Sequence, residues 1–229
     1  SPINKSKGVS KFTVVAINRF VEKKGIEILI QTAALCPEVF FQIYGYGELE
    51  QSYLDLIDSL HLNNVKLMGK IHNRNQLLHA LKNASLFCCP CIQAKNGDMD
   101  GIPTSIIEAM SFGIPCLTSN ISGISSLIKN GFNGFLVKPD KESLASSIMR
   151  IKDMDSDALY RICCNARYSA SQNHNVVPTI GKAISIWAHQ EVDIGLVTWN
   201  NLTEMSEVIR RIYRFTTAPF HLIICDNYS

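Results

Sequence analysis

The feature that most constrains the fold is the alternation of short apolar segments with segments of helical spacing along residues 12–189. Each apolar segment is a few residues long and is followed by Gly, Pro or a polar turn, which is typical of buried strands. The segments between them repeat apolar residues at intervals of three and four, which is typical of helices that pack on one side. Strands that are joined through helices run parallel and have both faces covered. The sequence therefore predicts an α/β protein with a doubly wound parallel sheet.

The expected elements follow one another with short connections. The predicted strands are residues 12–17, 39–44, 65–68, 84–89, 115–118 and 134–137. The predicted helices are residues 24–36, 48–60, 75–82, 104–112, 124–129, 141–151, 156–171 and 177–189. In open sheets of this kind ligands bind beyond the carboxyl ends of the strands. We therefore expect the functional residues in the loops that follow the strands.

The pattern restarts near Glu191 with a strand at 192–199, a helix at 203–215 and a second strand at 220–225. A single β-α-β unit is too small to bury its own faces. We therefore predict two domains, a complete one in residues 1–190 and the incomplete start of another in residues 191–229.

The composition restricts the class of protein. Hydrophobic residues make up 46% of the chain and charged residues 18%, which is enough apolar surface for a sizeable core. The formal net charge of +2 gives no global electrostatic reason to bind nucleic acid or an acidic membrane. We find no signal peptide and no apolar run that could cross a bilayer, so we expect a cytoplasmic protein for which peripheral membrane association stays open.

The eight cysteines also favour a cytoplasmic location. Most of them fall in apolar runs, where buried and reduced thiols are expected, and these indicate a reducing environment. The segment Cys88-Cys89-Pro90-Cys91 has no second Cys or His pair at ligand spacing. We therefore predict no metal site.

The segment from Asp100 to Met110 carries the clearest chemistry. It holds two carboxylates, Asp100 and Glu108, separated by a loop that enters a predicted helix at Thr104. A helix N-terminus presents unpaired backbone N–H groups and the positive end of the helix dipole, which together favour phosphate. A carboxylate on each side can accept hydrogen bonds from sugar hydroxyls. The combination suits a ligand that joins phosphates to sugars.

A second group of residues follows the first predicted strand. Arg19 stands at the carboxyl end of that strand, and Lys24 and Gly25 open the next helix. Two cations at this place could clamp a diphosphate and stabilise charge as it leaves. The alternative is a solvated loop with ordinary surface charges.

Four motifs, taken in order, resemble those of retaining glycosyltransferases of family 4. They are residues 16–25, 43–49, 101–110 and 131–137. The resemblance covers about residues 10–190 and corresponds to the C-terminal, nucleotide-sugar-binding half of a GT-B enzyme, which is Rossmann-like. It implies transfer of a sugar from a nucleoside-diphosphate sugar to an acceptor hydroxyl with retention, without a cofactor. The acceptor-binding N-terminal half of such an enzyme is missing from this sequence.

The resemblance also implies roles for single residues. Arg19 and Lys24 would hold the donor diphosphate, and Glu108 would bind the ribose hydroxyls. Asp100 takes the place of a Glu near the transferred sugar and is one methylene shorter. Further donor contacts are implied for Gly45, Gly47, Ile71, Gly101, Ile102, Pro103, Thr104 and Ser105. Among these, the glycines would let the chain pass close to the ligand, the helix start would give N–H groups to phosphate, and Ile71 would touch the base.

The tail carries a weaker resemblance to the opening of a family 2 glycosyltransferase of GT-A fold. Residues that match Thr198 and Asp226 lie near the nucleotide in that family. The natural protein could therefore carry two transferase domains in tandem.

Two other functions stay open at this point. One is a nucleotide-sugar epimerase of the same two-domain architecture. The other is a degenerate binding module, which Asp100 and the replacement of a family Pro-Glu by Ser125-Ser126 favour slightly, and which Arg19, Lys24 and Glu108 disfavour. For the transferase we expect the chain alone to bind nucleotide but to transfer little or no sugar.

Overall fold

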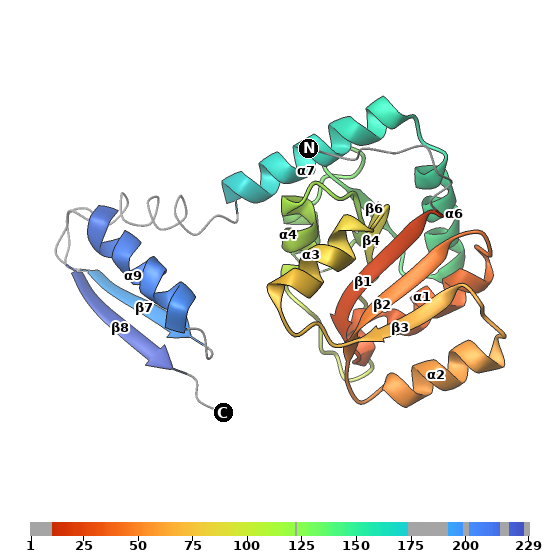
Figure 1. Ribbon diagram of the computed structural model, residues 1–229, viewed down its shortest axis with the longest axis horizontal. Helices are drawn as coiled ribbons and strands as arrows, with labels where there is room; N and C mark the ends of the chain where they lie inside the picture. The colour runs from red at the N-terminus through yellow and green to blue at the C-terminus, as the bar shows by residue number, and fades with distance from the viewer. Residues whose placement is uncertain (1–10, 122, 174–191, 199–201, 216–219, 227–229) are drawn as a thin grey trace. The chain divides into compact units, whose positions relative to one another are not determined.

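The computed structural model describes residues 11–121, 123–173, 192–198, 202–215 and 220–226. It divides into two compact units, Ser1–Ala170 and Ser171–Ser229, which are described separately here (Figure 1). The predicted helix at 177–189 lies outside the described residues. The predicted domain boundary near residue 190 stays a prediction, since the neighbouring residues are not described either.

The first unit is built on a six-stranded sheet in the order β3-β2-β1-β4-β5-β6 (Figure 1). Every neighbouring pair in it is parallel. The strands are β1 (Thr13–Arg19), β2 (Phe40–Tyr46), β3 (Val65–Gly69), β4 (Leu86–Cys89), β5 (Cys116–Ser119) and β6 (Phe135–Val137). The chain winds from β1 outward to β3 and then returns to place β4 on the other side of β1. The doubly wound parallel sheet predicted from the sequence is confirmed.

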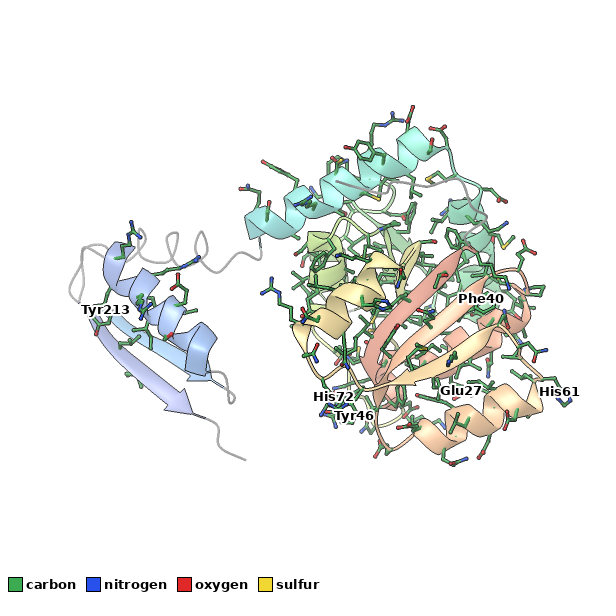
Figure 2. The ribbon with its side chains drawn as sticks, viewed as in Figure 1. Glu27, Phe40, Tyr46, His61, His72 and Tyr213 are labelled. Atoms are coloured by element: carbon green, nitrogen blue, oxygen red, sulfur yellow. The ribbon has the colours of Figure 1, made fainter. Side chains whose placement is uncertain are left out.

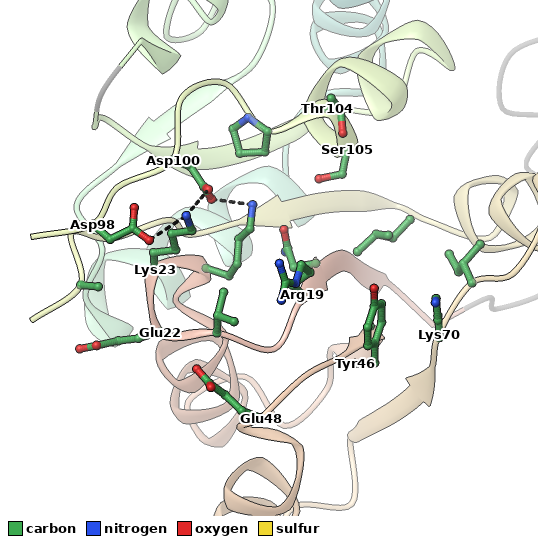
Figure 3. Close-up of a pocket in the computed structure, with 18 of the residues that line it drawn as sticks. Arg19, Glu22, Lys23, Tyr46, Glu48, Lys70, Asp98, Asp100, Thr104 and Ser105 are labelled. Carbon is green, nitrogen blue, oxygen red and sulfur yellow. Dashed lines mark ion pairs between the residues drawn. The ribbon is translucent and has the colours of Figure 1, made fainter. Parts of the chain in front are cut away.

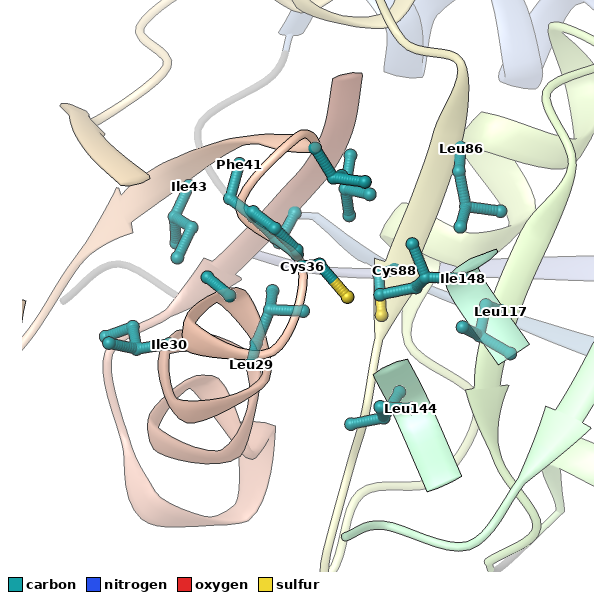
Figure 4. Packing of buried hydrophobic residues seen from close by; sticks show 14 of the residues in the cluster. Leu29, Ile30, Cys36, Phe41, Ile43, Leu86, Cys88, Leu117, Leu144 and Ile148 are labelled. Atoms are coloured by element: carbon teal, nitrogen blue, oxygen red, sulfur yellow. The ribbon is translucent and has the colours of Figure 1, made fainter. Parts of the chain in front are cut away.

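Helices cover both faces of this sheet. The helices are α1 (Ile26–Ala34), α2 (Glu50–Ser59), α3 (Arg74–Lys82), α4 (Thr104–Ser111), α5 (Ile124–Leu127), α6 (Lys141–Lys152) and α7 (Ser156–Asn173). One core cluster joins α1, α2 and α6 to the sheet, and a second joins α3, α4, α5 and α7 to the opposite face. In β4 the side chains of Leu86 and Cys88 enter the first cluster, whereas Phe87 and Cys89 enter the second (Figure 4). This alternation explains why β4 is apolar throughout, since a strand in the middle of the sheet is buried on both sides.

The connection from β1 to α1 differs from the prediction. The predicted helix at 24–36 is divided into a 3-10 turn, η1 (Glu22–Lys24), and α1, which begins at Ile26. Gly25 separates the two with a left-handed φ of +64°. A Cβ atom at this position would lie 2.0 Å from the carbonyl oxygen of Pro90, so the backbone after β1 and the backbone after β4 touch there. The helical spacing seen in the sequence belongs to α1, and Lys24 lies just before it.

The burial of the cysteines is confirmed for most of those described. Six of the seven free cysteines that the structure describes are buried, and Cys164 on α7 is exposed. None of the described helices is long and apolar enough to cross a membrane.

The second unit is a β-α-β unit, as predicted. It consists of β7 (Val192–Thr198), α9 (Leu202–Phe215) and β8 (Phe220–Asp226). The two strands are parallel and pair along their whole length, so Thr198 and Asp226 are partners at the carboxyl ends. Along α9, Arg211 Nε lies 2.8 Å from Glu207 Oε1 one turn earlier, and Tyr213 is exposed (Figure 2).

The close approach at Gly25 generates a stability prediction. Replacing Gly25 by Ala adds backbone strain and a clash with the Pro90 carbonyl. Gly131 is the matched control, because its φ is +75° and no atom lies within 4 Å of the position of a Cβ. We expect Gly131→Ala to lower the free energy of unfolding by about 1 kcal/mol, the cost of a left-handed Ala. We expect Gly25→Ala to lower it by about 3 kcal/mol or more. Urea denaturation of both variants measures the difference, and equal losses would contradict a steric role for Pro90.

Candidate functional site

A cleft of about 640 Å³ opens at the carboxyl edge of the sheet (Figure 3). Its floor includes the ends of β1 and β2, and its walls come from η1, from the loop between β4 and α4, and from the start of α4. The connections that leave β1 and β4 diverge at this edge, because the chain passes from β1 to β2 on one side and from β4 to β5 on the opposite side. Such switch points are where open α/β sheets bind ligands.

Cations form one wall of the cleft. Arg19 ends β1, and Lys23 and Lys24 come from η1 directly after it. The left-handed Gly25 ends this short turn and brings it against Pro90, which directly follows β4. The backbone N–H of Lys95 donates to Glu22 Oε1 at 3.3 Å, which joins η1 to the loop that follows β4. These contacts hold η1 against the loop that follows β4.

Two carboxylates from the β4–α4 loop face the lysines (Figure 3). Lys24 Nζ lies 2.5 Å from Asp100 Oδ2, and Lys23 Nζ lies 3.4 Å from Asp100 Oδ1. Lys23 Nζ also lies 2.9 Å from Asp98 Oδ2. The hydrogen bond that Lys23 donates to Asp98 is the largest cause that raises the pKa of Lys23, and the charge of Asp100 adds to it. Asp100 therefore bridges both lysines, and Lys23 stays protonated throughout the neutral pH range.

The start of α4 forms the opposite wall. Pro103 occupies the N-cap position, and no side chain there accepts a hydrogen bond from the first turn. Thr104 and Ser105 line the cleft, so the N-terminal end of α4 borders it. The helix dipole places partial positive charge at this end.

Glu108 lies one turn further along α4 and also lines the cleft. Its side chain keeps contact with solvent, and the partial burial around it raises the pKa of the carboxyl group above the ordinary value. A carboxyl group with a raised pKa can still be ionised at neutral pH and can then accept hydrogen bonds from a ligand.

Nine of the twelve predicted site residues line this one cleft. They are Arg19, Lys24, Gly45, Ile71, Asp100, Pro103, Thr104, Ser105 and Glu108. The structure thus brings together residues that are far apart in the sequence, and it pairs Lys24 directly with Asp100, which the sequence did not indicate. The individual roles of these residues stay predictions.

Gly47, Gly101 and Ile102 are not among the residues that line the cleft. A Cβ on Gly47 would lie 2.5 Å from the carbonyl oxygen of Phe20, so the protein itself fills the space beside this glycine. Gly101 is exposed, and Ile102 packs against the second core cluster. Gly45 lines the cleft, but a Cβ there would lie 1.9 Å from the carbonyl oxygen of Asn18. Gly45 in β2 and Gly47 just after it therefore have a packing requirement that is independent of any ligand.

Several cleft residues were not identified from the sequence. They are Ile17, Asn18, Val21, Glu22, Lys23, Tyr46, Glu48, Lys70, Ala94, Asn96 and Asp98. Lys70 Nζ lies 4.4 Å from the centre of the Tyr46 ring (Figure 3 shows both side chains on the same side of the cleft). The positions of Asn18, Tyr46 and Lys70 at or just after strand ends could have indicated them. The loop residues Asn96 and Asp98 gave no such signal.

In the described part of the chain, no group of three or more His, Cys, Asp or Glu side chains has an arrangement that could hold a metal ion.

Comparison with known proteins places this fold and cleft in a family. The sequence model of the glycosyl transferases group 1 family matches residues 3–167. WcaL of Salmonella typhimurium, named for colanic acid biosynthesis, is 31% identical over 167 residues, which are 71% of this chain and 41% of that protein. An Escherichia coli UDP-Gal:alpha-D-GlcNAc-diphosphoundecaprenol alpha-1,3-galactosyltransferase is 30% identical over 160 residues, covering 69% of this chain and 39% of the relative.

A solved structure agrees with the sequence relatives. The crystal structure of Anabaena HepE in complex with UDP and glucose is 30% identical, with a TM-score of 0.65 over 78% of this chain and 48% of HepE. This chain spans about two fifths of the length of the curated relatives that it matches. The matched region contains the whole six-stranded sheet and its cleft, and the chain belongs to the glycosyl transferases group 1 family.

Proposed function

We propose that this chain is the donor-binding half of a retaining GT-B glycosyltransferase of family 4, and that its cleft binds a nucleoside-diphosphate sugar. The observation that carries the proposal is the convergence of Arg19, Lys24, Glu108 and the start of α4 on one cleft at the switch point of the sheet. Anion-binding groups and a carboxylate for hydroxyl groups lie within one site. A sugar nucleotide presents both kinds of group.

The diphosphate binds between the cationic wall and the start of α4. Arg19 and Lys24 donate charge-assisted hydrogen bonds, and the first N–H groups of α4 donate from the other side. When the sugar leaves, negative charge develops on the diphosphate, and these fixed positive groups stabilise it. The charge that the chain supplies here makes a metal ion or other cofactor unnecessary in the proposed reaction.

The contact between Lys24 and Asp100 supports a place for the transferred sugar beside Asp100. Their side chains are 14% and 15% exposed, so this ion pair is largely removed from water. A diphosphate that recruits Lys24 competes with Asp100 for the same ammonium group. Asp100 is then left beside Lys23 and next to the diphosphate, where it can accept a hydrogen bond from a hydroxyl of the transferred sugar.

The other end of the ligand is assigned to Glu108 and Ile71. Glu108 accepts hydrogen bonds from the ribose hydroxyls, and the backbone near Ile71 contacts the base. UDP in the HepE structure and UDP-Gal in the name of the galactosyltransferase support uridine as the base. The donor proposed for this chain is therefore a UDP-hexose.

The complete reaction needs more protein than this chain contains. Retention in this fold proceeds by loss of the nucleoside diphosphate with attack of an acceptor hydroxyl on the same face. The acceptor would bind to an N-terminal half that this sequence lacks. The colanic acid name of WcaL and the diphosphoundecaprenol acceptor in the name of the galactosyltransferase support a role in polysaccharide biosynthesis. The location proposed for the protein is the cytoplasm or its membrane surface.

The tail is proposed to be the opening of a GT-A transferase domain. The pairing of Thr198 with Asp226 at the carboxyl ends of β7 and β8 supports this, since nucleotides bind at that edge of such sheets.

Titration of UDP tests the cationic wall. We expect the chain to bind UDP without added metal, and Arg19→Ala and Lys24→Ala each to weaken binding about tenfold or more, because each removes a charged hydrogen bond to phosphate. Lys66→Ala is the matched control, since Lys66 is an exposed lysine on β3 outside the cleft. Calorimetry gives the dissociation constants. Failure of the parent chain to bind any nucleoside diphosphate would contradict the donor site.

The pH dependence of binding tests Glu108. Burial raises the pKa of this carboxyl group, so it becomes protonated at a higher pH than an ordinary Glu and loses an acceptor for ribose. We expect UDP to lose affinity, relative to inorganic pyrophosphate, as the pH falls through that raised pKa. Glu108→Gln should bind UDP weakly at neutral pH and lack this additional loss. A parent and a variant with parallel pH profiles would exclude a ribose contact.

Product analysis tests whether sugar transfer requires the N-terminal half. We expect the isolated chain to transfer no detectable hexose from UDP-hexose to lipid-linked or free sugar acceptors, because no acceptor-binding half orients the nucleophile. The same preparation should bind UDP, which is the control for a folded cleft. Appreciable transfer to an acceptor would refute the division of roles, and release of an epimerised sugar nucleotide without an acceptor would indicate an epimerase.

A further inference from the structure

Asn18 is a buried polar residue on the floor of the cleft that the proposed function does not use. It is 8% exposed, and its side-chain nitrogen Nδ2 is buried and has no hydrogen-bond partner among the described residues. Buried amide donors in folded proteins nearly always have a partner, so an unpaired one that lines a cleft indicates a ligand or a bound water.

The orientation of this amide is fixed by a thiol. Cys89, at the end of β4, donates its S–H to Asn18 Oδ1 at a distance of 3.3 Å. Cys89 is fully buried, and Cys91 Sγ lies 3.3 Å from its sulfur. With Cys91 as the donor of that contact, the single S–H of Cys89 is available to Asn18 Oδ1. With Oδ1 occupied as an acceptor, the other end of the amide presents N–H groups only.

The position of Asn18 places it at the switch point itself. It is the next-to-last residue of β1 and is followed directly by Arg19. Its partner Cys89 ends β4, the neighbour of β1 in the sheet. Asn18 therefore lies where the connections of β1 and β4 diverge, in a cleft that Arg19 and Lys24 also line.

The neighbouring charges indicate which kind of acceptor pairs with Asn18 Nδ2. An amide N–H beside cationic side chains favours an acceptor that carries negative charge. We propose that Asn18 Nδ2 donates a hydrogen bond to a phosphoryl oxygen of the diphosphate that binds in this cleft, and that Asn18 is a further binding residue of the donor site. This inference depends on the proposed function, because it assumes that a diphosphate occupies the cleft. Because this nitrogen is buried, the proposed contact requires cleft side chains to shift as the ligand enters.

Two substitutions separate the lost donor from other effects. Asn18→Asp keeps the shape and the acceptor for Cys89 but replaces the donor by an oxygen. Asn18→Leu removes the donor without adding charge. Ser119→Ala is the control, because Ser119 at the end of β5 also has a buried oxygen without a partner among the described residues but does not line the cleft. Thermal unfolding of each variant shows that the fold is retained.

Titration of the full chain with inorganic pyrophosphate, UDP and uridine measures the effect. We expect Asn18→Leu to weaken binding of pyrophosphate and UDP by the same factor, about tenfold, and Asn18→Asp to weaken both further. Uridine binding should not change in either variant, and Ser119→Ala should bind all three ligands as the parent does. If Asn18→Leu does not fold, Asn18→Ala, which also removes the donor without adding charge, takes its place in the same comparison.

Other outcomes overturn the inference. If Asn18→Asp weakens phosphate binding and Asn18→Leu does not, the effect is one of added charge. If both variants bind the phosphate ligands as the parent does, a water or no group pairs with Nδ2. If the parent chain binds none of the phosphate ligands, the proposed function itself is wrong. This result differs from failure of the Asn18 inference, because it is seen in the parent without any variant.

Discussion

The contact between Gly25 and Pro90 is the constraint on which the site depends. A left-handed residue without a Cβ lets the backbone after β1 touch the backbone after β4, since any side chain at Gly25 would overlap the Pro90 carbonyl. The contact fixes the short turn η1, which carries Lys23 and Lys24, against the loop that carries Asp98 and Asp100. Two segments more than sixty residues apart in the sequence thereby become facing walls of one cleft.

Charge then determines what this cleft can hold. Four cationic side chains and five carboxylates line the cleft, so its net charge does not favour an anion. The local placement of Arg19 and Lys24, together with the dipole of α4, favours an anion whose own charge is localised beside them. Glu108 stands apart from the ion pairs on α4, where it can serve uncharged hydroxyl groups. The cleft is therefore polarised along its length, as a sugar nucleotide requires.

The sequence predicted the sheet and nine of the twenty residues that line the cleft, because both follow from local patterns. Apolar runs that alternate with helical spacing identify the strands, Arg19 ends a strand, and Asp100 and Glu108 lie on either side of a predicted helix start. The sequence did not predict the break before α1, because helical spacing does not report the backbone conformation of Gly25. It also missed Lys23, Asp98 and Asn18, since their importance arises from contacts between segments that are distant in the chain. For the same reason the sequence did not show that Gly45 and Gly47 pack against Asn18 and Phe20, whatever contact they make with a ligand.

The replacement of a family Glu by Asp100 can be understood from these contacts. A shorter side chain brings the carboxylate within ion-pair distance of both lysines, with Lys24 at 2.5 Å and Lys23 at 3.4 Å. Removing Lys24 from a largely buried pair would leave an uncompensated carboxylate if Asp100 had no second partner, and that state is costly. Lys23 provides a second partner, which Asp100 shares with Asp98. Lys24 can therefore turn toward the proposed diphosphate while Asp100 keeps an ion-pair partner, so that the acid which holds the lysine in place does not prevent it from binding the ligand.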